Sequence, residues 1–133
     1  MRTDELRVRH GAHHPLDLVA TNFTGDLRDK SAGREHLQRR LIRLAELQEK
    51  LYAQRKHAVL VIMQGMDTSG KDSAIAHVFT GFNPEGLTVR NFKQPTSEEL
   101  AHDFLWPASR VLPERGHIAV FNRSYYEEVL VVR

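Results

Sequence analysis

The chain carries the loop Gly65-Met66-Asp67-Thr68-Ser69-Gly70-Lys71-Asp72 directly after the apolar run Ala58-Val59-Leu60-Val61-Ile62-Met63. The apolar run predicts a buried strand, and residues 72–80 read as a helix. Glycines between a strand and a helix let backbone N–H groups turn around a phosphate, and the helix N-terminus adds partial positive charge. We therefore predict a phosphate-binding loop in which Lys71 supplies a mobile cation. The other residues expected to contact phosphate here are Gly65, Met66, Thr68, Ser69 and Gly70.

Two carboxylates accompany this loop. Asp67 lies inside it, and Asp72 stands where such loops usually carry the Ser or Thr that touches Mg²⁺, with Ser73 one place later. Phosphates repel an acid unless a divalent cation lies between them, which favours Asp67 as a Mg²⁺ ligand or a base. The alternative is that either aspartate caps the following helix. Asp72 is compatible with both roles.

Composition limits the class of protein. The 133 residues allow one domain at most, and 41% hydrophobic and 27% charged residues are typical of a soluble globular protein. The net charge of +2 does not demand a nucleic-acid partner, and the absence of cysteine excludes disulfides and thiolate zinc sites. No apolar run reaches membrane-spanning length, and residues 1–5 are not a signal peptide. We expect a cytoplasmic protein.

The N-terminal third divides into an arm and a helix. Residues 1–32 lack sustained periodicity, and their histidines (His10, His13 and His14) have no acidic cluster nearby, which favours a polar arm over a metal site. Residues 33–55 predict an amphipathic helix, which would start a domain over residues 33–133. Its apolar stripe is interpreted as core packing rather than a partner surface. The stripe contains Leu37, Leu41, Leu44, Leu47, Leu51 and Tyr52.

Two more strands are predicted after the loop and its helix. Residues 83–86 mark a turn, and residues 87–92 and 117–121 read as strands. Between them Thr96 and Glu99 form a capping box for a helix that Pro107 should end or kink. A further helix is predicted over residues 125–132. Strands that alternate with helices indicate an α/β fold with a parallel sheet.

Sites in parallel α/β sheets gather beyond the carboxyl ends of the strands, where the loop, Lys93, Asn122 and Arg123 all fall. Phosphoryl transfer needs positive charge, a metal and alignment of the reacting oxygens rather than covalent help. Arg123 is favoured as a catalytic cation over the alternative of a surface ion pair with Glu127 or Glu128. Lys93 and Arg90 either extend a basic track that suits a long polyanion or are solvated surface residues.

These motifs, in this order, resemble the polyphosphate kinase 2 family. The resemblance covers residues 47–133, including the end of the long helix at Leu51-Tyr52-Ala53. It is carried by Val61-Ile62-Met63-Gln64-Gly65-Met66-Asp67-Thr68-Ser69-Gly70-Lys71-Asp72, Gly81-Phe82-Asn83-Pro84-Glu85-Gly86, Phe92-Lys93-Gln94-Pro95-Thr96, Glu98-Glu99-Leu100-Ala101-His102-Asp103-Phe104-Leu105-Trp106, Leu112-Pro113-Glu114-Arg115-Gly116 and Phe121-Asn122-Arg123-Ser124-Tyr125-Tyr126-Glu127-Glu128-Val129-Leu130-Val131.

The resemblance implies a P-loop kinase fold with a helical lid. It also implies Mg²⁺-dependent phosphoryl transfer between inorganic polyphosphate and AMP or ADP, with AMP, ADP and ATP as nucleotide partners. By resemblance, Asp67 is the metal-binding acid and Lys71 the phosphate lysine. Asn122-Arg123-Ser124 stands where the family often has Asp-Arg-Ser, and an amide at this position brings no negative charge to a cation. The form of this motif is most similar to the branch that phosphorylates both AMP and ADP.

The family pattern extends beyond Arg133, through more strands and a lid with another phosphate-contacting arginine. We therefore expect the 133-residue chain to be an incomplete three-stranded domain, marginally stable and a poor catalyst alone. Self-association as a homo-oligomer would cover its exposed sheet edge or its long helix. Two alternatives stay open: an ATP-dependent kinase of a small substrate, and a catalytically inactive phosphate-binding remnant.

Overall fold

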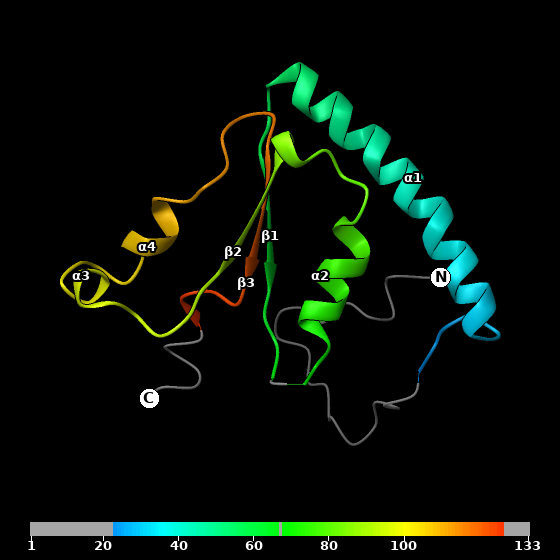
Figure 1. Cartoon of the computed structure of the whole chain (residues 1–133), viewed down its shortest axis with the longest axis horizontal. Coiled ribbons are helices and arrows are strands. Elements are labelled where there is room, and N and C mark those ends of the chain that lie inside the picture. Colours follow the sequence, from blue (N-terminus) through cyan, green and yellow to red (C-terminus); the bar gives the residue numbers. More distant parts are fainter. Residues whose placement is uncertain (1–22, 67, 127–133) are drawn as a thin grey trace, which may run out of the picture. The chain divides into compact units, whose positions relative to one another are not determined.

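The computed structural model describes residues 23–66 and 68–126. By its internal contacts the chain divides between Arg40 and Leu41 into two units, and the sheet belongs to the second. The boundary predicted between residues 32 and 33 stays a prediction. The elements are α1 (Lys30–Gln54), β1 (Val59–Met63), α2 (Lys71–Phe79), the 3₁₀ turn η3 (Pro84–Gly86), β2 (Leu87–Asn91), α3 (Ser97–Leu100), α4 (Trp106–Ser109) and β3 (Ile118–Asn122), and Figure 1 labels all of them except η3.

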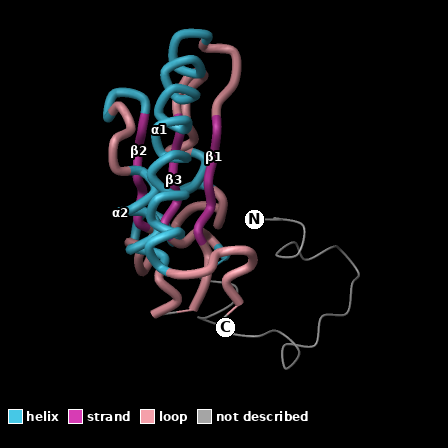
Figure 2. Tube along the Cα trace, turned by 90° about the vertical axis from the view of Figure 1, so that its right-hand side faces the viewer, coloured by secondary structure: helices cyan, strands magenta, loops and turns pink. Residues whose placement is uncertain are grey.

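The three described strands form one parallel sheet in the order β1-β3-β2. Figure 2 shows β3 in the middle, with β1 and β2 beside it. The register aligns Met63 and Asn91 with Asn122, so the three strands end at the same level. The predicted α/β fold with a parallel sheet is thereby confirmed. The expectation of one unpaired sheet edge was wrong for this part of the chain, because β3 is central and both β1 and β2 are edges.

The core lies on both faces of β3, whose successive side chains point to opposite sides. Ile118 and Val120 pack with Ile75 of α2, whereas Ala119 and Phe121 pack with Ala108 of α4. Helices therefore cover both faces, as a parallel sheet requires. Partly buried side chains complete the first face (Leu51, Val61, Met63, Phe79, Phe82 and Leu87) and the second (Phe92, Val111 and Tyr125).

Helix α1 begins at Lys30, three residues before its predicted start, where the Asp29 carboxylate accepts a hydrogen bond from the Ala32 N–H (2.8 Å). Of its apolar stripe, Leu51 packs against the core of the sheet, and Leu37, Leu41 and Tyr52 are half-buried. Leu44 and Leu47 remain 38% and 45% exposed, so the core-packing interpretation was wrong for these two residues. A helical period identifies the apolar face but not what covers it.

The residue that α1 buries completely is polar. Gln48 is 2% exposed, and its carboxamide makes two bonds to the backbone of Asn83. Its Nε2 donates to the Asn83 carbonyl (2.8 Å), and its Oε1 accepts from the Asn83 N–H (2.7 Å). Gly86 lies against this pair, because a Cβ there would meet Gln48 Nε2 at 3.0 Å. The predicted turn over residues 83–86 is confirmed as η3, held to the end of α1.

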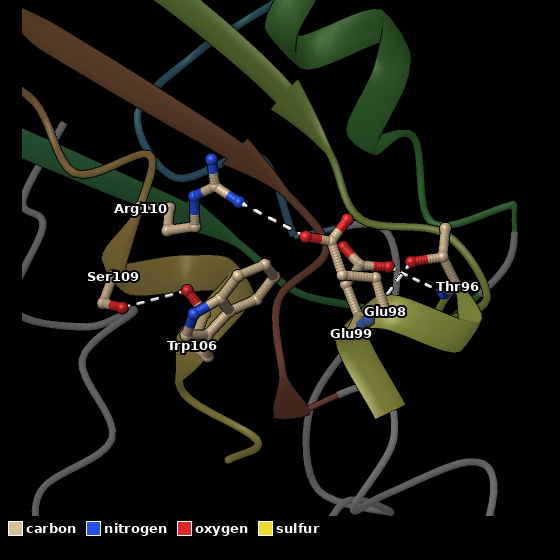
Figure 3. A network of polar contacts seen from close by, with 6 residues as sticks. All are labelled: Thr96, Glu98, Glu99, Trp106, Ser109 and Arg110. Atoms are coloured by element: carbon tan, nitrogen blue, oxygen red, sulfur yellow. Dashed lines mark hydrogen bonds and ion pairs between the residues drawn. The ribbon is translucent and has the colours of Figure 1, made fainter. Parts of the chain in front are cut away.

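The segment between β2 and β3 departs from the predicted single helix (Figure 3). The capping box is present: the Glu99 N–H donates to Thr96 Oγ1 (3.3 Å) and the Thr96 N–H to Glu99 Oε2 (2.7 Å). The backbone hydrogen bond from Thr96, with its side-chain bond, lowers the pKa of Glu99. However, α3 ends at Leu100, and Pro107 lies in the first turn of α4. Pro107 does not end or kink a helix, because a first-turn residue has no intrahelical N–H bond to lose.

A row of side-chain contacts connects α3 to α4. The His102 ring stacks on Trp106 with centroids 4.0 Å apart, and the Arg110 guanidinium lies 4.7 Å from the Trp106 ring. Arg110 Nη1 is also 4.0 Å from Glu98 Oε1 (Figure 3). The ion pair is exposed and contributes little on its own. The helix predicted over residues 125–132 starts at Tyr126, and its remainder lies outside the described residues. None of the described helices is long and apolar enough to cross a membrane.

Candidate phosphate site

The candidate site lies where the parallel strands end. The chain leaves β1 through Gln64 and a glycine-rich loop and enters α2 at Lys71. The carboxyl ends of β2 and β3 bring Asn91 and Asn122 to the same edge. Because Arg123 follows β3 and donates its N–H to the Met63 carbonyl (3.0 Å), it is fixed beside the end of β1. Segments far apart in the sequence thus converge at this edge of the sheet.

Two glycines of the loop are required by its geometry. A Cβ at position 65 would lie 2.8 Å from Ser69 Oγ, closer than real Cβ atoms come to a neighbour. Gly70 has φ +86° and is the N-cap of α2, without a side-chain capping bond. Thr68 also adopts positive φ (65°), which is uncommon for a residue with a side chain. Gly70 therefore gives α2 no side-chain cap, and the backbone N–H groups of the first turn are donors suited to an anion.

Lys71 is the buried cation of the loop. It is 9% exposed, and its Nζ donates to the carbonyl oxygens of Gly65 (2.7 Å) and Met66 (2.8 Å). An ammonium group has three N–H donors, so these two bonds leave one for a further acceptor. Lys71 also lines the cavity at the start of α2, where a phosphate oxygen is a suitable acceptor.

Two adjoining cavities occupy the edge of the sheet. The first measures about 250 Å³ and is lined by Thr68, Gly70, Lys71, Asp72, Ser73 and Arg123. The second measures about 400 Å³ and is lined by Asp72, Asn91, Phe92, Lys93, Gln94, Asn122 and Arg123. Asp72 and Arg123 line both cavities, so this acid and this cation lie where the two cavities meet. Arg123 holds its place with a left-handed backbone (φ 66°).

Most of the predicted site residues meet in these cavities. Thr68, Gly70, Lys71, Asp72 and Ser73 line the first, and Lys93 and Asn122 line the second. Gly65, Met66 and Ser69 shape the loop without lining either cavity, and neither lining includes Arg90. Asp67 lies outside the described residues, as do Glu127 and Glu128, the alternative partners of Arg123. The metal-ligand role of Asp67 therefore stays a prediction.

Asp72 does not cap its own helix. Its Oδ1 accepts a hydrogen bond from Asn122 Nδ2 across 2.6 Å, which ties the first turn of α2 to the end of β3. A carboxylate in this turn is also favoured by the helix dipole. The open question about Asp72 is thus answered against capping, and its carboxylate stands at the wall between the two cavities.

Sequence reasoning missed three residues of the second cavity, Asn91, Phe92 and Gln94. Asn91 is the last residue of β2, aligned with Asn122, and its Oδ1 accepts a second hydrogen bond from Asn122 Nδ2 (2.9 Å). The rule that sites gather at the carboxyl ends of strands applied to β2 as it did to β3. Asn91 was passed over because it was counted only as a strand residue.

The oxygen-bearing side chains around the cavities can be compared with the ligands that Mg²⁺ takes in proteins. No group of three or more His, Asp or Glu side chains that could enclose a metal occurs among residues 23–66 and 68–126. Mg²⁺ usually takes one or two carboxylates and completes its shell with water and substrate phosphates. The Asp72 carboxylate fits that need. Asn122 Oδ1 fits it too, because this oxygen is buried and has no hydrogen-bond partner within the described chain.

A parallel sheet whose first strand runs into a glycine-rich loop and a helix is the architecture of the P-loop kinase class. The sequence pattern of the polyphosphate kinase 2 family matches residues 27–133. The chain belongs to this family.

The chain is similar to named relatives over its whole length. It is 49% identical over 133 residues to an "ADP-polyphosphate phosphotransferase" of Rhodopseudomonas palustris, covering all of this chain and 46% of the relative. It is 53% identical over 91 residues to an "AMP/ADP-polyphosphate phosphotransferase" of Meiothermus ruber, covering 68% of this chain and 34% of the relative. The chain spans less than half the length of these relatives.

A solved structure has the same fold. The crystal structure of polyphosphate kinase 2 from Arthrobacter aurescens TC1 is 40% identical and superposes with a TM-score of 0.85. The superposition covers 98% of this chain and 47% of that protein. The resemblance stated from the motifs and the P-loop kinase-like fold are both confirmed.

Proposed function

We propose that this chain carries the phosphate-handling half of an enzyme that transfers phosphoryl groups between inorganic polyphosphate and AMP or ADP with Mg²⁺. The observation that carries the proposal is the pair of adjoining cavities with Asp72 and Arg123 between them. Two phosphate groups that exchange a phosphoryl group must lie side by side and in line. The names of the relatives, which are polyphosphate phosphotransferases of ADP or of AMP and ADP, support this substrate class.

Each residue has a distinct part in this proposal. Lys71 donates its remaining N–H to a phosphate oxygen beside the N-terminus of α2. Arg123 reaches both cavities, where its guanidinium balances charge on the phosphoryl group in transfer. Lys93 adds positive charge to the second cavity. Mg²⁺, when bound, shields and aligns phosphate oxygens, and Asp67 and Asp72 are the carboxylates proposed to hold it.

The bond changes explain why the proposed step needs cations near the phosphates and no general base. A terminal P–O bond of polyphosphate breaks, and a new bond forms from that phosphorus to a terminal phosphate oxygen of the nucleotide. A phosphate monoester has a second pKa of about 6, so near neutral pH the attacking oxygen carries no proton to remove. The polyphosphate is shortened by one unit, and the nucleotide gains one phosphate.

The direct experiment mixes the chain with Mg²⁺, polyphosphate and either AMP or ADP, and separates the nucleotides chromatographically. Formation of ADP or ATP that requires polyphosphate supports the proposal. Transfer only from ATP to a small acceptor would favour the alternative ATP-dependent kinase, and phosphate binding without transfer would favour the inactive remnant. The cytoplasmic location stays a prediction.

A further inference from the structure

Asn91, which faces Asn122 across the sheet, completes a chain of three polar side chains at the edge of the second cavity. Asn122 Nδ2 donates one N–H to Asn91 Oδ1 (2.9 Å) and the other to Asp72 Oδ1 (2.6 Å). We propose that Asn91 is a positioning residue, which acts through Asn122 to hold the Asp72 carboxylate at the wall shared by the two cavities. The inference rests on the proposed function, in which this wall faces the reacting phosphates.

The hydrogen-bonding chemistry allows only one arrangement of the chain. A carboxylate at Asp72 can only accept, so Asn122 must present its nitrogen to it. The same nitrogen then faces Asn91, which must present its oxygen. Asn91 thereby locks the Asn122 amide against rotation by half a turn, which would set its oxygen against the carboxylate. Asn122 Oδ1 is left buried and without a hydrogen-bond partner among the described residues.

The position of the carboxylate matters because its charge has the same sign as a phosphate. Asp72 is an exposed side chain at the start of α2, and Asn122 Nδ2 donates a hydrogen bond to its carboxylate. A carboxylate beside phosphates opposes their binding in the absence of a divalent cation and promotes it when a cation lies between them. Holding Asp72 at the wall should therefore raise the affinity for phosphates with Mg²⁺ and lower it without Mg²⁺.

The test measures the affinity of ADP by calorimetry, with and without Mg²⁺, for the wild-type chain and for Asn91→Ala. We expect the gain in affinity due to Mg²⁺ to fall by about 3- to 10-fold, the range of one hydrogen bond, whereas the Mg²⁺-free affinity should not fall, because the repelling carboxylate is released. The control is Thr88→Ala, another exposed residue of the same edge strand that lines neither cavity. It should change neither affinity.

A double-mutant cycle separates positioning from a general structural effect. If Asn91 acts through Asp72, Asn91→Ala should have no further effect on Mg²⁺-dependent affinity in an Asp72→Asn background. An equal loss with and without Mg²⁺, or an undiminished effect in that background, would overturn the positioning role even though the wild-type chain binds Mg²⁺ and ADP as proposed.

A wild-type chain that binds no ADP would instead overturn the proposed function. In that case, nuclear magnetic resonance still tests whether the three side chains are hydrogen-bonded to one another in solution. The side-chain amide protons of Asn122 should shift in Asn91→Ala, which removes one acceptor, and in Asp72→Asn, which replaces a charged acceptor by a neutral one. Unchanged resonances in both variants would show that the three side chains do not form this chain in solution, and would overturn the inference without reference to any ligand.

Discussion

Lys71 Nζ lies 2.7 Å from the carbonyl oxygen of Gly65 and 2.8 Å from that of Met66, so the loop lysine is bound by the loop that it serves. The two carbonyls fix the ammonium beneath the loop, next to the first cavity. These two bonds give hydrogen-bond partners to an ammonium group whose side chain is only 9% exposed. Lys71 therefore helps to fix the conformation of the loop and also supplies its positive charge.

Replacing Lys71 by Ala should weaken the binding of ADP or polyphosphate by about 1.5–3 kcal/mol, the value of a hydrogen bond to a charged group. Lys56→Ala is the matched control, because it removes the same charge from an exposed position that lines neither cavity. Calorimetry on both variants checks the prediction. Equal affinity for Lys71→Ala and wild type would remove the loop from the mechanism.

Asp67→Asn should abolish most of the Mg²⁺ dependence of nucleotide binding, because the amide keeps the size and capping ability of the side chain but loses its charge. We expect the affinity gained on adding Mg²⁺ to fall about tenfold or more, which corresponds to about 1.4 kcal/mol. Glu49→Gln on α1 is the control for loss of one negative charge. A variant with normal Mg²⁺ dependence would show that Asp67 is not a metal ligand.

Gln48→Ala should destabilise the fold by about 1–3 kcal/mol, because it removes two hydrogen bonds and leaves the Asn83 N–H without Gln48 Oε1, although the Asn83 carbonyl keeps the bond from the Gly86 N–H. Urea denaturation followed by circular dichroism measures the change. Glu49→Ala, at the neighbouring exposed position of α1, should cost only a few tenths of a kcal/mol. If both substitutions had the same small effect, Gln48 would not join α1 to the turn before β2.

The chain should self-associate and turn over slowly. In the described residues both β1 and β2 have an unpaired edge, and Leu44 and Leu47 of α1 are exposed. Leu47→Glu and Val89→Lys test the helix and the β2 edge separately, and sedimentation velocity shows which one disperses the assembly. A monodisperse monomer with the turnover of a full-length relative would contradict both expectations.

The fold could be predicted from the sequence because its elements have strong local signals. The apolar runs at 58–63 and 117–121 form the expected strands, Gly65 has a close neighbour in Ser69, and Gly70 has a positive φ that favours glycine. The parallel arrangement then brought Lys93, Asn122 and Arg123 to one edge. These residues could be anticipated since the carboxyl ends of parallel strands always meet.

Tertiary context explains what the sequence did not predict. The stripe on α1 identifies an apolar face, but a three-stranded sheet covers only the part near Leu51. Pro107 was interpreted as a helix breaker, although the same residue suits the first turn of a new helix. The role of Asn91 depends on its register with Asn122, which no local pattern encodes.

Transfer of phosphate from polyphosphate to ADP is the most direct measurement of the proposed function. It should be made with this chain, with Lys71→Ala, and with a longer protein that spans the full length of the relatives. We predict slow, Mg²⁺-dependent formation of ATP by the 133-residue chain, loss of this activity in Lys71→Ala, and a much higher rate for the longer protein. If polyphosphate gave no ATP with the longer protein, while ATP phosphorylated another acceptor, the proposed function would be wrong.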